Sequence, residues 1–543
     1  MLEYLEKQIR ARLAKLGWSP ERLQFNRSKK VENGDWATNI AMTLARDLKR
    51  APLQIAEELT DGLTLDPNIV SKHEVVPPGF INFFQSPPYL TNQLQNLIDA
   101  GEDFGKNSTG AGKTAQVEFV SANPTGPLTV GHGRQTVLGD TLANILTWSG
   151  YDVTREYYFN NAGRQMRLLG ESLQARYFEL KGETITLPDG GYEGEYLIDI
   201  AKQLQADQPN LDSGTSIDIF KTYAETAIFN TIKATLKRIG VVHDVFYNER
   251  SLYKTGKIDE VLSILRKKEL LYEKDGATWF KTSELGIEQD RVLVKSSGEP
   301  TYRLPDIAYH REKVARGFDL VVDIFGADHI DAYPDVLAAL KVMDLKSEHI
   351  KVVIHQFVTL LRSGEVVKMS TRKANFVTLD ELIDEVGEDV VRYFYIMRSA
   401  SSHLNFDLDL AKRQTDENPV FYLQYAHARI SSIFRRAAER GLEPHGQETD
   451  LTLLNEEFTV ALINETLALP EVIERCMRTL EVHHLPTYLF GLATALHKFY
   501  TEYKVIDLDN PTRSYARLAL LKAVQTSLGN GLRILGIHAP EHM

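Results

Sequence analysis

Residues 115–180 repeat a strand pattern and a helix pattern twice, and this alternation limits the possible folds more than any other feature of the chain. The runs AQVEFV and DVTREYYF are typical of strands, and amphipathic helices are predicted over 131–149 and 161–180. Strand, helix and strand in this order form the βαβ unit of a parallel sheet. Further strands are predicted at 319–327 and 351–358, so we expect an α/β, Rossmann-type domain.

The chain of 543 residues is too long for one ordinary core, and its patterns divide it into three parts. Residues 1–110 mix helical patterns with a strand pattern interrupted by Pro and Gly, which predicts an N-terminal α+β domain. Residues 111–405 carry the parallel-sheet pattern, with a helix-rich insertion predicted at about 183–300. Residues 406–543 show helical periodicity without strands, which predicts an all-α C-terminal bundle.

Composition excludes several classes of protein. No run of about 18 apolar residues occurs, so no membrane span is predicted. The single cysteine, Cys476, excludes an internal disulfide and a cysteine-based zinc cluster, and we expect a reducing, cytoplasmic location. The formal net charge of −12 argues against a nucleic-acid partner for the chain as a whole. Basic runs such as FRRAAER at 434–440 still allow a local RNA-facing surface, although a solvated helix face explains each run alone.

The segment between the first strand and the first helix of the α/β domain ends in Gly131-His132-Gly133. In open parallel sheets, ligands bind beyond the carboxyl ends of the strands, where a helix N-terminus offers free N–H groups to an anion. The two glycines allow a nucleotide to approach the backbone, and His132 can donate to a phosphate oxygen. A tight turn without a ligand explains these three residues equally well.

A second short motif, Lys368-Met369-Ser370, follows a predicted hairpin turn with the sequence RSGE. Lysine and serine on a loop supply the charge-assisted donors that a departing pyrophosphate needs. Each motif lies beside a strand of one sheet, and together they predict a nucleotide site.

The two motifs resemble the HIGH and KMSKS signatures of class I aminoacyl-tRNA synthetases. The chain resembles the arginyl-tRNA synthetase family along nearly its whole length, through SANPTGPLTVGHGRQ, YYFNNAGRQ, DRVLVKSSGEPTY, PDIAYHREKVARGFDLVVDIFGADH, NPVFYLQYAHARI and NGLRILGIHAPEHM. The resemblance implies a ligase that joins L-arginine to its cognate tRNA in two steps. ATP and arginine would first form arginyl-adenylate and pyrophosphate, and a terminal tRNA hydroxyl would then take the arginyl group and release AMP.

The resemblance also implies the residues of the arginine pocket. Carboxylates placed for forked pairing suit a guanidinium group. The implied arginine-binding residues are Glu118, Tyr302 and Asp306 at the guanidinium, Ser121, Asn123 and His132 at the α-amino and carboxylate end, and His329 at the close of the pocket.

Catalytic and ATP-binding residues follow from the same resemblance. The implied catalytic residues are Thr129, His132, Lys368 and Ser370, and the implied ATP-binding residues are Gly131, His132, Gly133, Gly326, Lys368, Met369 and Ser370. Mg²⁺ would accompany the ATP phosphates without a dedicated protein site.

Both signatures depart from the family pattern. Thr129 stands where the first signature has a histidine, and its hydroxyl carries no positive charge. Thr371 replaces the second lysine of KMSKS, with Arg372 and Lys373 following as alternative donors. Thr129 could also serve only as a helix cap.

The C-terminal bundle resembles an anticodon-binding domain. Tyr422, Tyr425 and Arg429 share one predicted helix face, and rings with a guanidinium suit the stacking of unpaired bases. Tyr503 and Met543 match further positions near the anticodon, and the N-terminal domain resembles a tRNA-elbow module. The expected partners are tRNA(Arg), L-arginine and ATP, no membrane is involved, and we expect a monomer.

Two other functions remain open from the residues. The first is an adenylate-forming enzyme for another substrate, which the paired acids Glu118 and Asp306 disfavour. The second is a non-enzymatic RNA-binding relative, which only Thr129 and Thr371 favour.

Overall fold

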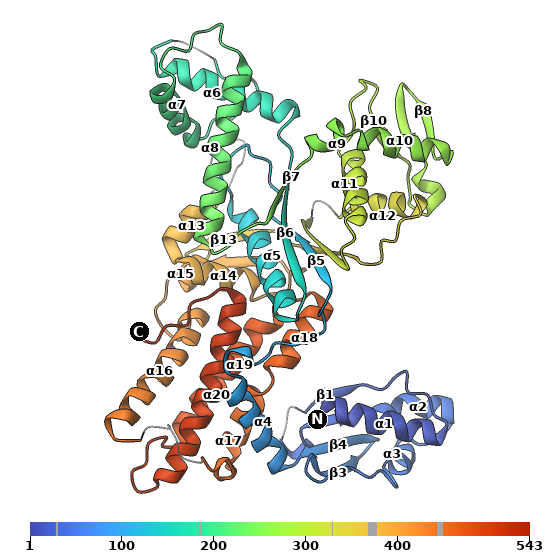
Figure 1. The fold of residues 1–543 in the computed structure, drawn as a ribbon, viewed down its shortest axis with the longest axis vertical. Helices are drawn as coiled ribbons and strands as arrows, with labels where there is room; N and C mark the ends of the chain where they lie inside the picture. The colour runs from blue at the N-terminus through green and yellow to red at the C-terminus, as the bar shows by residue number, and fades with distance from the viewer. Residues whose placement is uncertain (29–30, 184–185, 328–329, 368–376, 443–448) are drawn as a thin grey trace.

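The computed structural model describes residues 1–28, 31–183, 186–327, 330–367, 377–442 and 449–543 (Figure 1). Within these residues, the largest hydrophobic core runs continuously from a central parallel sheet into the C-terminal helices. Two separate cores lie elsewhere. One packs against helices α11 (Arg303–Ala315) and α12 (Tyr333–Val342), and the other lies inside the N-terminal module. The expected α/β fold with a helical C-terminal part is confirmed.

The N-terminal module is built on a four-stranded antiparallel sheet of order β1-β2-β4-β3. Leu5, Ile9 and Leu13 lie about one turn apart on the first helix and are fully buried, as their spacing predicts. The elements are α1 Leu2–Leu16, β1 Phe25–Arg27, β2 Trp36–Thr38, α2 Ile40–Leu48, α3 Pro52–Thr60, β3 Val70–Val76 and β4 Phe80–Gln85.

The central sheet has five parallel strands in the order β12-β11-β5-β6-β7. The chain runs from β5 to β6 on one side and later returns to β11 on the other, so β5 marks the topological switch point where ligands bind in such sheets. The elements are β5 Thr114–Glu118, α5 Val130–Trp148, β6 Asp152–Phe159, α6 Gly163–Glu179, β7 Val245–Asn248, α11 Arg303–Ala315, β11 Leu320–Gly326, α12 Tyr333–Val342 and β12 Ile350–His355.

Two expectations about this sheet are corrected. The predicted insertion at 183–300 is not one unit, because β7 lies inside it and pairs with β6 from Glu156↔Val245 onward. The predicted strand at 351–358 is two strands of different sheets, because the chain leaves β12 at Gln356 and begins β13 at Val358. A four-residue strand and a two-residue break are too short to alter the periodicity of a sequence window.

The segments on either side of β7 form separate groups at the top of Figure 1. The first group packs two further helices on α6, namely α7 Glu195–Asp207 and α8 Ile217–Arg238. The second group carries a three-stranded antiparallel sheet and short helices, namely α9 Arg250–Lys254, α10 Lys257–Lys267, β8 Leu271–Lys274, β9 Ala277–Phe280 and β10 Arg291–Val294.

A fourth sheet, β14-β13-β15, lies between the parallel-sheet domain and the bundle. The predicted domain boundary at 405/406 cuts β15, which pairs in parallel with β13 and therefore belongs to the catalytic side. The elements are β13 Val358–Arg362, β14 Glu365–Val366, α13 Leu379–Val386, α14 Glu388–Ile396, β15 Leu404–Asp407, α15 Leu408–Ala411, α16 Pro419–Glu439, α17 Glu457–Thr466, α18 Leu469–Thr479, α19 His484–Glu502 and α20 Pro511–Leu535.

Helix α4, Pro87–Ala100, belongs to the main core although it follows the N-terminal module in sequence. Its leucines Leu90, Leu94 and Leu97 pack in that core, and Asn530 of α20 donates to the carbonyl of Phe104 just beyond the helix. The N-terminal module itself therefore ends at β4, before the predicted boundary at residue 110.

The buried arginine Arg392 links helix α14 to three segments that are distant in sequence. Arg392 of α14 donates to the carbonyl of Ile239 after α8, to the carbonyl of Leu535 in α20 and to the carboxylate of Asp140 in α5. Asn144 of α5 also donates to α20, at the carbonyl of Ile534. The end of the last helix is thus fixed to the helix that begins at the Gly-His-Gly turn.

Among the helices that the structure describes, none has the length and apolar character needed to cross a lipid bilayer.

Candidate active site

A cavity of about 640 Å³ opens at the carboxyl ends of β5, β6 and β11. Its wall includes the turn after β5, the first residues of α5, the end of β6, the start of α11 and the end of β11. This is the switch point of the sheet, where the sequence predicts a nucleotide and its co-substrate.

Most of the predicted substrate residues that the structure describes lie around this one cavity. They are Glu118, Ser121, Asn123, Thr129, Gly131, His132, Tyr302, Asp306 and Gly326. Gly133 lies inside the protein, where a Cβ would stand 2.7 Å from the hydroxyl of Tyr395, so its lack of a side chain serves packing. His329 and the signature residues Lys368, Met369 and Ser370, with Thr371, Arg372 and Lys373, lie outside the described residues.

The turn after β5 has an unusual backbone. Val120 and Ser121 have φ angles of 70° and 42°, values that side chains other than glycine seldom adopt. Ser121 Oγ accepts from the N–H of Tyr158 at 3.1 Å, and Asn123 Oδ1 accepts from the N–H of Asn160 at 2.9 Å. These bonds to β6 hold Ser121 and Asn123 at the edge of the cavity.

Helix α5 begins at the cavity with Thr129 as its N-cap residue. Gly131 is exposed there, so the first N–H groups of the helix can meet an anion. The N–H of Thr129 donates to Nδ1 of His132 at 3.1 Å, and burial lowers the pKa of His132. The imidazole is therefore neutral near pH 7, and its other nitrogen, which has no hydrogen-bond partner among the residues that the structure describes, can face a ligand.

The segment that follows the second signature is bonded to the first signature. The N–H of Val130 donates to the carbonyl of Val377 at 3.3 Å, and the N–H of Leu379 donates to the carbonyl of Leu128 at 2.8 Å. Thr129 and Thr378 form an isolated antiparallel bridge between these bonds. Residues 377–379, which follow the second signature in sequence, thus lie beside the first signature at 128–130.

Glu118 is buried, but its carboxylate already has two protein partners. It forms an ion pair with the ammonium of Lys313, and Ser121 Oγ donates to its other oxygen at 2.8 Å. Lys313 is shared with Asp323, so it offsets only part of the charge of Glu118, which still lines the cavity. The expectation did not include these two protein partners of Glu118.

Two other carboxylates face the cavity without a cationic partner among the described residues. Burial raises the pKa of Asp306 to about 7, with Glu249 and Glu118 adding to the effect and His310 opposing it. Burial likewise raises the pKa of Glu249, whose oxygens accept from Tyr158 Oη and Asn160 Nδ2, both at 2.7 Å. A cation in the cavity would relieve the cost of ionising both groups.

Glu249 is a cavity residue that was not predicted from the sequence. It follows directly after β7, and its place at the cavity depends on β7 being a strand of the main sheet. Recognition of VFYN at 245–248 as a parallel strand would have put Glu249 at the carboxyl edge with the other site residues.

A second cavity, of about 590 Å³, lies on the C-terminal bundle. The predicted residues Tyr425, Arg429, Tyr503 and Met543 line it, and Arg429 donates to the hydroxyl of Tyr425 at 2.7 Å. Tyr422 is not among its lining residues and packs its ring 5.3 Å from that of Phe490. The wall also carries the basic residues Arg435, Arg436, Arg440 and Lys504. The cavity thus combines aromatic rings with basic side chains, although the chain as a whole has a net charge of −12. Such a surface is suited to unpaired RNA bases and their phosphates.

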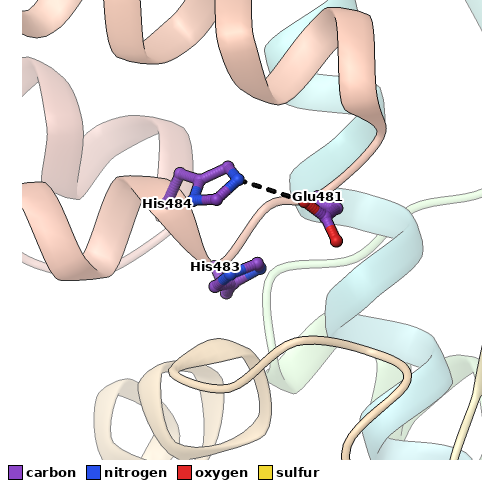
Figure 2. A group of neighbouring side chains, drawn as sticks. All are labelled: Glu481, His483 and His484. Carbon is purple, nitrogen blue, oxygen red and sulfur yellow. Dashed lines mark hydrogen bonds and ion pairs between the residues drawn. The ribbon is translucent and has the colours of Figure 1, made fainter. Parts of the chain in front are cut away.

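Glu481, His483 and His484 are the group of described side chains whose donor atoms come close enough to hold one metal ion (Figure 2). His484 Nε2 lies 3.1 Å from the Glu481 carboxylate, and the two imidazole centroids are 4.2 Å apart. Burial is the main cause that lowers the pKa of both imidazoles, and Arg475 adds to it. The positive N-terminal end of α19 and Arg475 both oppose a cation, so we assign no metal here.

Three family models match successive parts of the chain. The model of the arginyl tRNA synthetase N terminal domain matches residues 3–85, that of the class I (R) tRNA synthetase catalytic domain matches 93–397, and that of the DALR anticodon binding domain matches 423–543.

Curated relatives and solved structures agree with these matches. An arginine–tRNA ligase of Desulfotalea psychrophila is 51% identical and covers 94% of this chain and 93% of its own, and one of Salinibacter ruber is 48% identical over the whole of both. The fold is similar to arginyl-tRNA synthetase of Thermus thermophilus, with a TM-score of 0.79 at 23% identity, covering 99% of each chain. It is also similar to that of Plasmodium falciparum, with a TM-score of 0.76 at 18% identity, covering 100% and 99%. The chain therefore belongs to the arginyl-tRNA synthetase family of class I enzymes, which aminoacylate tRNA with arginine.

Proposed function

We propose that the cavity at the switch point binds arginine with its guanidinium between Asp306 and Glu249. The observation that carries the proposal is the presence of these two partly buried carboxylates on the cavity wall, without a cationic partner among the described residues. A planar guanidinium offers five N–H donors and can satisfy both acids at once. Tyr302, beside Asp306 at the start of α11, provides a ring at the mouth of the cavity.

Charge and shape both select arginine at such a site. Lysine carries the charge as a compact ammonium that cannot pair in a fork with two separate acids. Citrulline has a similar shape but no charge, so both carboxylates would stay buried and unpaired. The α-amino and carboxylate end of arginine then lies toward Ser121, Asn123 and His132, as the family resemblance implies.

ATP belongs at the start of α5 in this proposal. The exposed Gly131 admits the phosphates to the helix N-terminus, His132 donates to a phosphate oxygen, and Gly326 borders the nucleotide. Lys368 and Ser370 keep their proposed role at the pyrophosphate, and Met369 its implied role in ATP binding. Mg²⁺ would be held by the phosphates themselves.

The reaction follows from these positions. An arginine carboxylate oxygen attacks the α-phosphorus, and the bond to the departing pyrophosphate breaks. His132 stabilises the charge that develops on the phosphoryl oxygens. In the second step a terminal ribose hydroxyl of tRNA attacks the carbonyl carbon of the adenylate and AMP leaves, so no covalent enzyme intermediate is formed.

The second cavity is proposed to receive the anticodon of tRNA(Arg), with Tyr425, Arg429 and Tyr503 as the base-contacting residues. The N-terminal module is proposed to bind the tRNA elbow. We further propose that the enzyme works as a monomer in the cytoplasm. We propose three domains, for binding of the tRNA elbow, for catalysis and for binding of the anticodon. The third domain begins after α15 and not at residue 406.

Aminoacylation of tRNA tests the proposed function directly. The purified chain is incubated with ATP, Mg²⁺, total tRNA and labelled arginine, lysine or glutamine, and acid-insoluble aminoacyl-tRNA is counted. The proposal expects charging with arginine alone and competition by excess arginine but not by citrulline. Tight tRNA binding without charging by any amino acid would contradict it.

A further inference from the structure

Lys313 is a fully buried cation that the reaction itself does not use. It lies in the last turn of α11, and its ammonium pairs with the carboxylates of Glu118 and Asp323, all three being at most 4% exposed. Burial opposes its charge, but Asp323 and Glu118 together more than offset this and raise the pKa of Lys313. An isolated buried charge is costly, so an ion at this place indicates a required position.

The backbone register explains why a cation is needed between the two acids. Glu118 on β5 and Asp323 on β11 are direct partners on adjacent parallel strands. Directly paired residues project to the same face of a sheet, so two buried carboxylates would repel each other there. Lys313 removes this repulsion by binding both.

One side of this ion pair leads to the turn after β5. Glu118 accepts from Ser121 Oγ at 2.8 Å, and the same hydroxyl accepts from the N–H of Tyr158 at 3.1 Å. Ser121 is one of two consecutive residues with positive φ, a backbone that persists only when its surroundings determine it. The orientation of Glu118 therefore fixes the turn that presents Asn123 to the cavity.

The other acid of this ion pair, Asp323, is connected through His310 to Asp306, the residue proposed to face the guanidinium. Asp323 lies 3.1 Å from Nε2 of His310, and Nδ1 of His310 lies 2.8 Å from the carbonyl oxygen of Asp306. Neither Lys313 nor Asp323 lines the cavity, whereas His310 and Asp306 do. A change at Lys313 or Asp323 can therefore reach the cavity through Glu118 and through His310, both of which line it.

We propose that Lys313 is a positioning residue for the arginine pocket, holding the 120–123 turn through Glu118 and the Asp306 end of α11 through Asp323. Glu118 itself lines the cavity, so Lys313 also fixes the orientation of one cavity carboxylate directly. The inference rests on the proposed function, since it concerns the binding of arginine in the same cavity.

The test compares Michaelis constants in arginine-dependent pyrophosphate exchange, with tRNA present throughout. Lys313→Met is expected to raise the KM for arginine by about tenfold or more, while the KM for ATP stays within about twofold, because a buried partner is lost on the arginine side only. Asp323→Asn keeps the size of the side chain and leaves Lys313 paired with Glu118. It is expected to raise the same KM by about threefold or more.

The matched control is Lys257→Met, which removes another ion pair of α11, that of Lys257 with Glu312, away from the cavity. Both Michaelis constants should stay within about twofold of the parent in this variant. Since Lys313 and Asp323 are in direct contact, their effects should not be additive, and the double variant should raise the arginine KM by less than the product of the two single effects.

Three results would overturn the inference. They are an unchanged arginine KM in a folded Lys313→Met protein, an equal rise in the arginine and ATP constants, and an unchanged arginine KM in Asp323→Asn. If Lys313→Met does not fold, Asp323→Asn decides. Failure of the proposed function is distinct, because the parent protein itself would then show no arginine-dependent exchange.

Discussion

The backbone N–H of Thr129 donates a hydrogen bond to Nδ1 of His132 across 3.1 Å. Nδ1 is therefore the accepting nitrogen of a neutral imidazole, and the proton sits on Nε2. Nε2–H is thereby available as a donor to a phosphate oxygen at the start of α5. The backbone N–H of Thr129, which any residue would supply, thus sets the tautomer of the signature histidine, and the Thr129 hydroxyl lies at the same distance of 3.1 Å from Nδ1.

Replacement of His132 should damage the chemical step. His132→Ala removes one donor aimed at the reacting phosphate, and such losses lower rates by about a hundredfold to a thousandfold. Arginine-dependent pyrophosphate exchange measures the effect, with the melting temperature expected to stay close to that of the parent. His349→Ala, which changes a histidine outside the cavity wall, serves as the control. A loss below about threefold would remove His132 from the catalytic residues.

Thr129→Val should separate stability from catalysis. The hydroxyl of an N-cap residue contributes about 1 kcal/mol to the free energy of unfolding, and valine cannot replace it. The backbone N–H that orients His132 remains, so the exchange rate is expected within about threefold of the parent. Denaturant unfolding and pyrophosphate exchange give the two numbers. A rate loss as large as that of His132→Ala would mean that the hydroxyl itself contacts ATP.

The carboxylates assigned to the guanidinium should control the affinity for arginine. Asp306→Asn and Glu249→Gln each remove one carboxylate and leave the bound guanidinium incompletely paired. This costs at least about 2 kcal/mol of binding free energy, or about thirtyfold in the arginine KM. Steady-state exchange with varied arginine measures this. Glu260→Gln, a surface acid that pairs with Arg311 of α11, should leave the constant unchanged. An effect of Asp306→Asn no larger than that control would contradict the pocket assignment.

Arginine binding should also depend on pH. The pKa of Asp306 is raised to about 7, so this carboxyl is protonated in the free enzyme at lower pH and must lose its proton to pair with a guanidinium. The KM for arginine is expected to fall by about tenfold per pH unit as the pH rises toward 7, and then to level off. Initial rates across this range test it, and Asp306→Asn should abolish this slope. A flat profile in the parent would exclude the titration.

The second cavity should determine the affinity for tRNA without affecting the activation of arginine. Arg429→Ala is expected to raise the KM for tRNA by about tenfold and to reduce the salt dependence of tRNA binding by about one contact. The KM for ATP and for arginine should not change. Arg413→Ala, an exposed arginine paired with Glu417 outside the cavity, is the matched surface control. Equal effects of the two variants would point to general electrostatics in place of a base-contacting role.

Long, strongly periodic segments could be predicted from the sequence, and short ones could not. The strand at 152–159 coincides with β6, because eight residues of strand-like composition bounded by helices leave little choice. β7 spans only Val245–Asn248 and is a strand because β6 lies beside it, which is a tertiary cause. The error at β7 carried over to Glu249.

The assignment of Glu118 shows a second limit. Sequence and resemblance placed a carboxylate at the end of β5, and it is there. Whether that carboxylate faces substrate depends on a lysine 195 positions later, in a different helix. Pairing between side chains so far apart in sequence leaves no local pattern. The separate roles of Glu118, Asp306 and Glu249 could therefore be assigned only from the three-dimensional structure.

The contacts of Arg392 bear on how the enzyme is made. Asp140 and Asn144 in α5 find partners at Arg392 and at Ile534, so the interior of the catalytic domain is completed by the last turn of the final helix. A chain emerging from the ribosome holds its signature helix long before that turn exists. Until then Asp140 and Asn144 bond to each other and to Arg155, so the helix that carries His132 gains its contacts with Arg392 and Ile534 only late in synthesis.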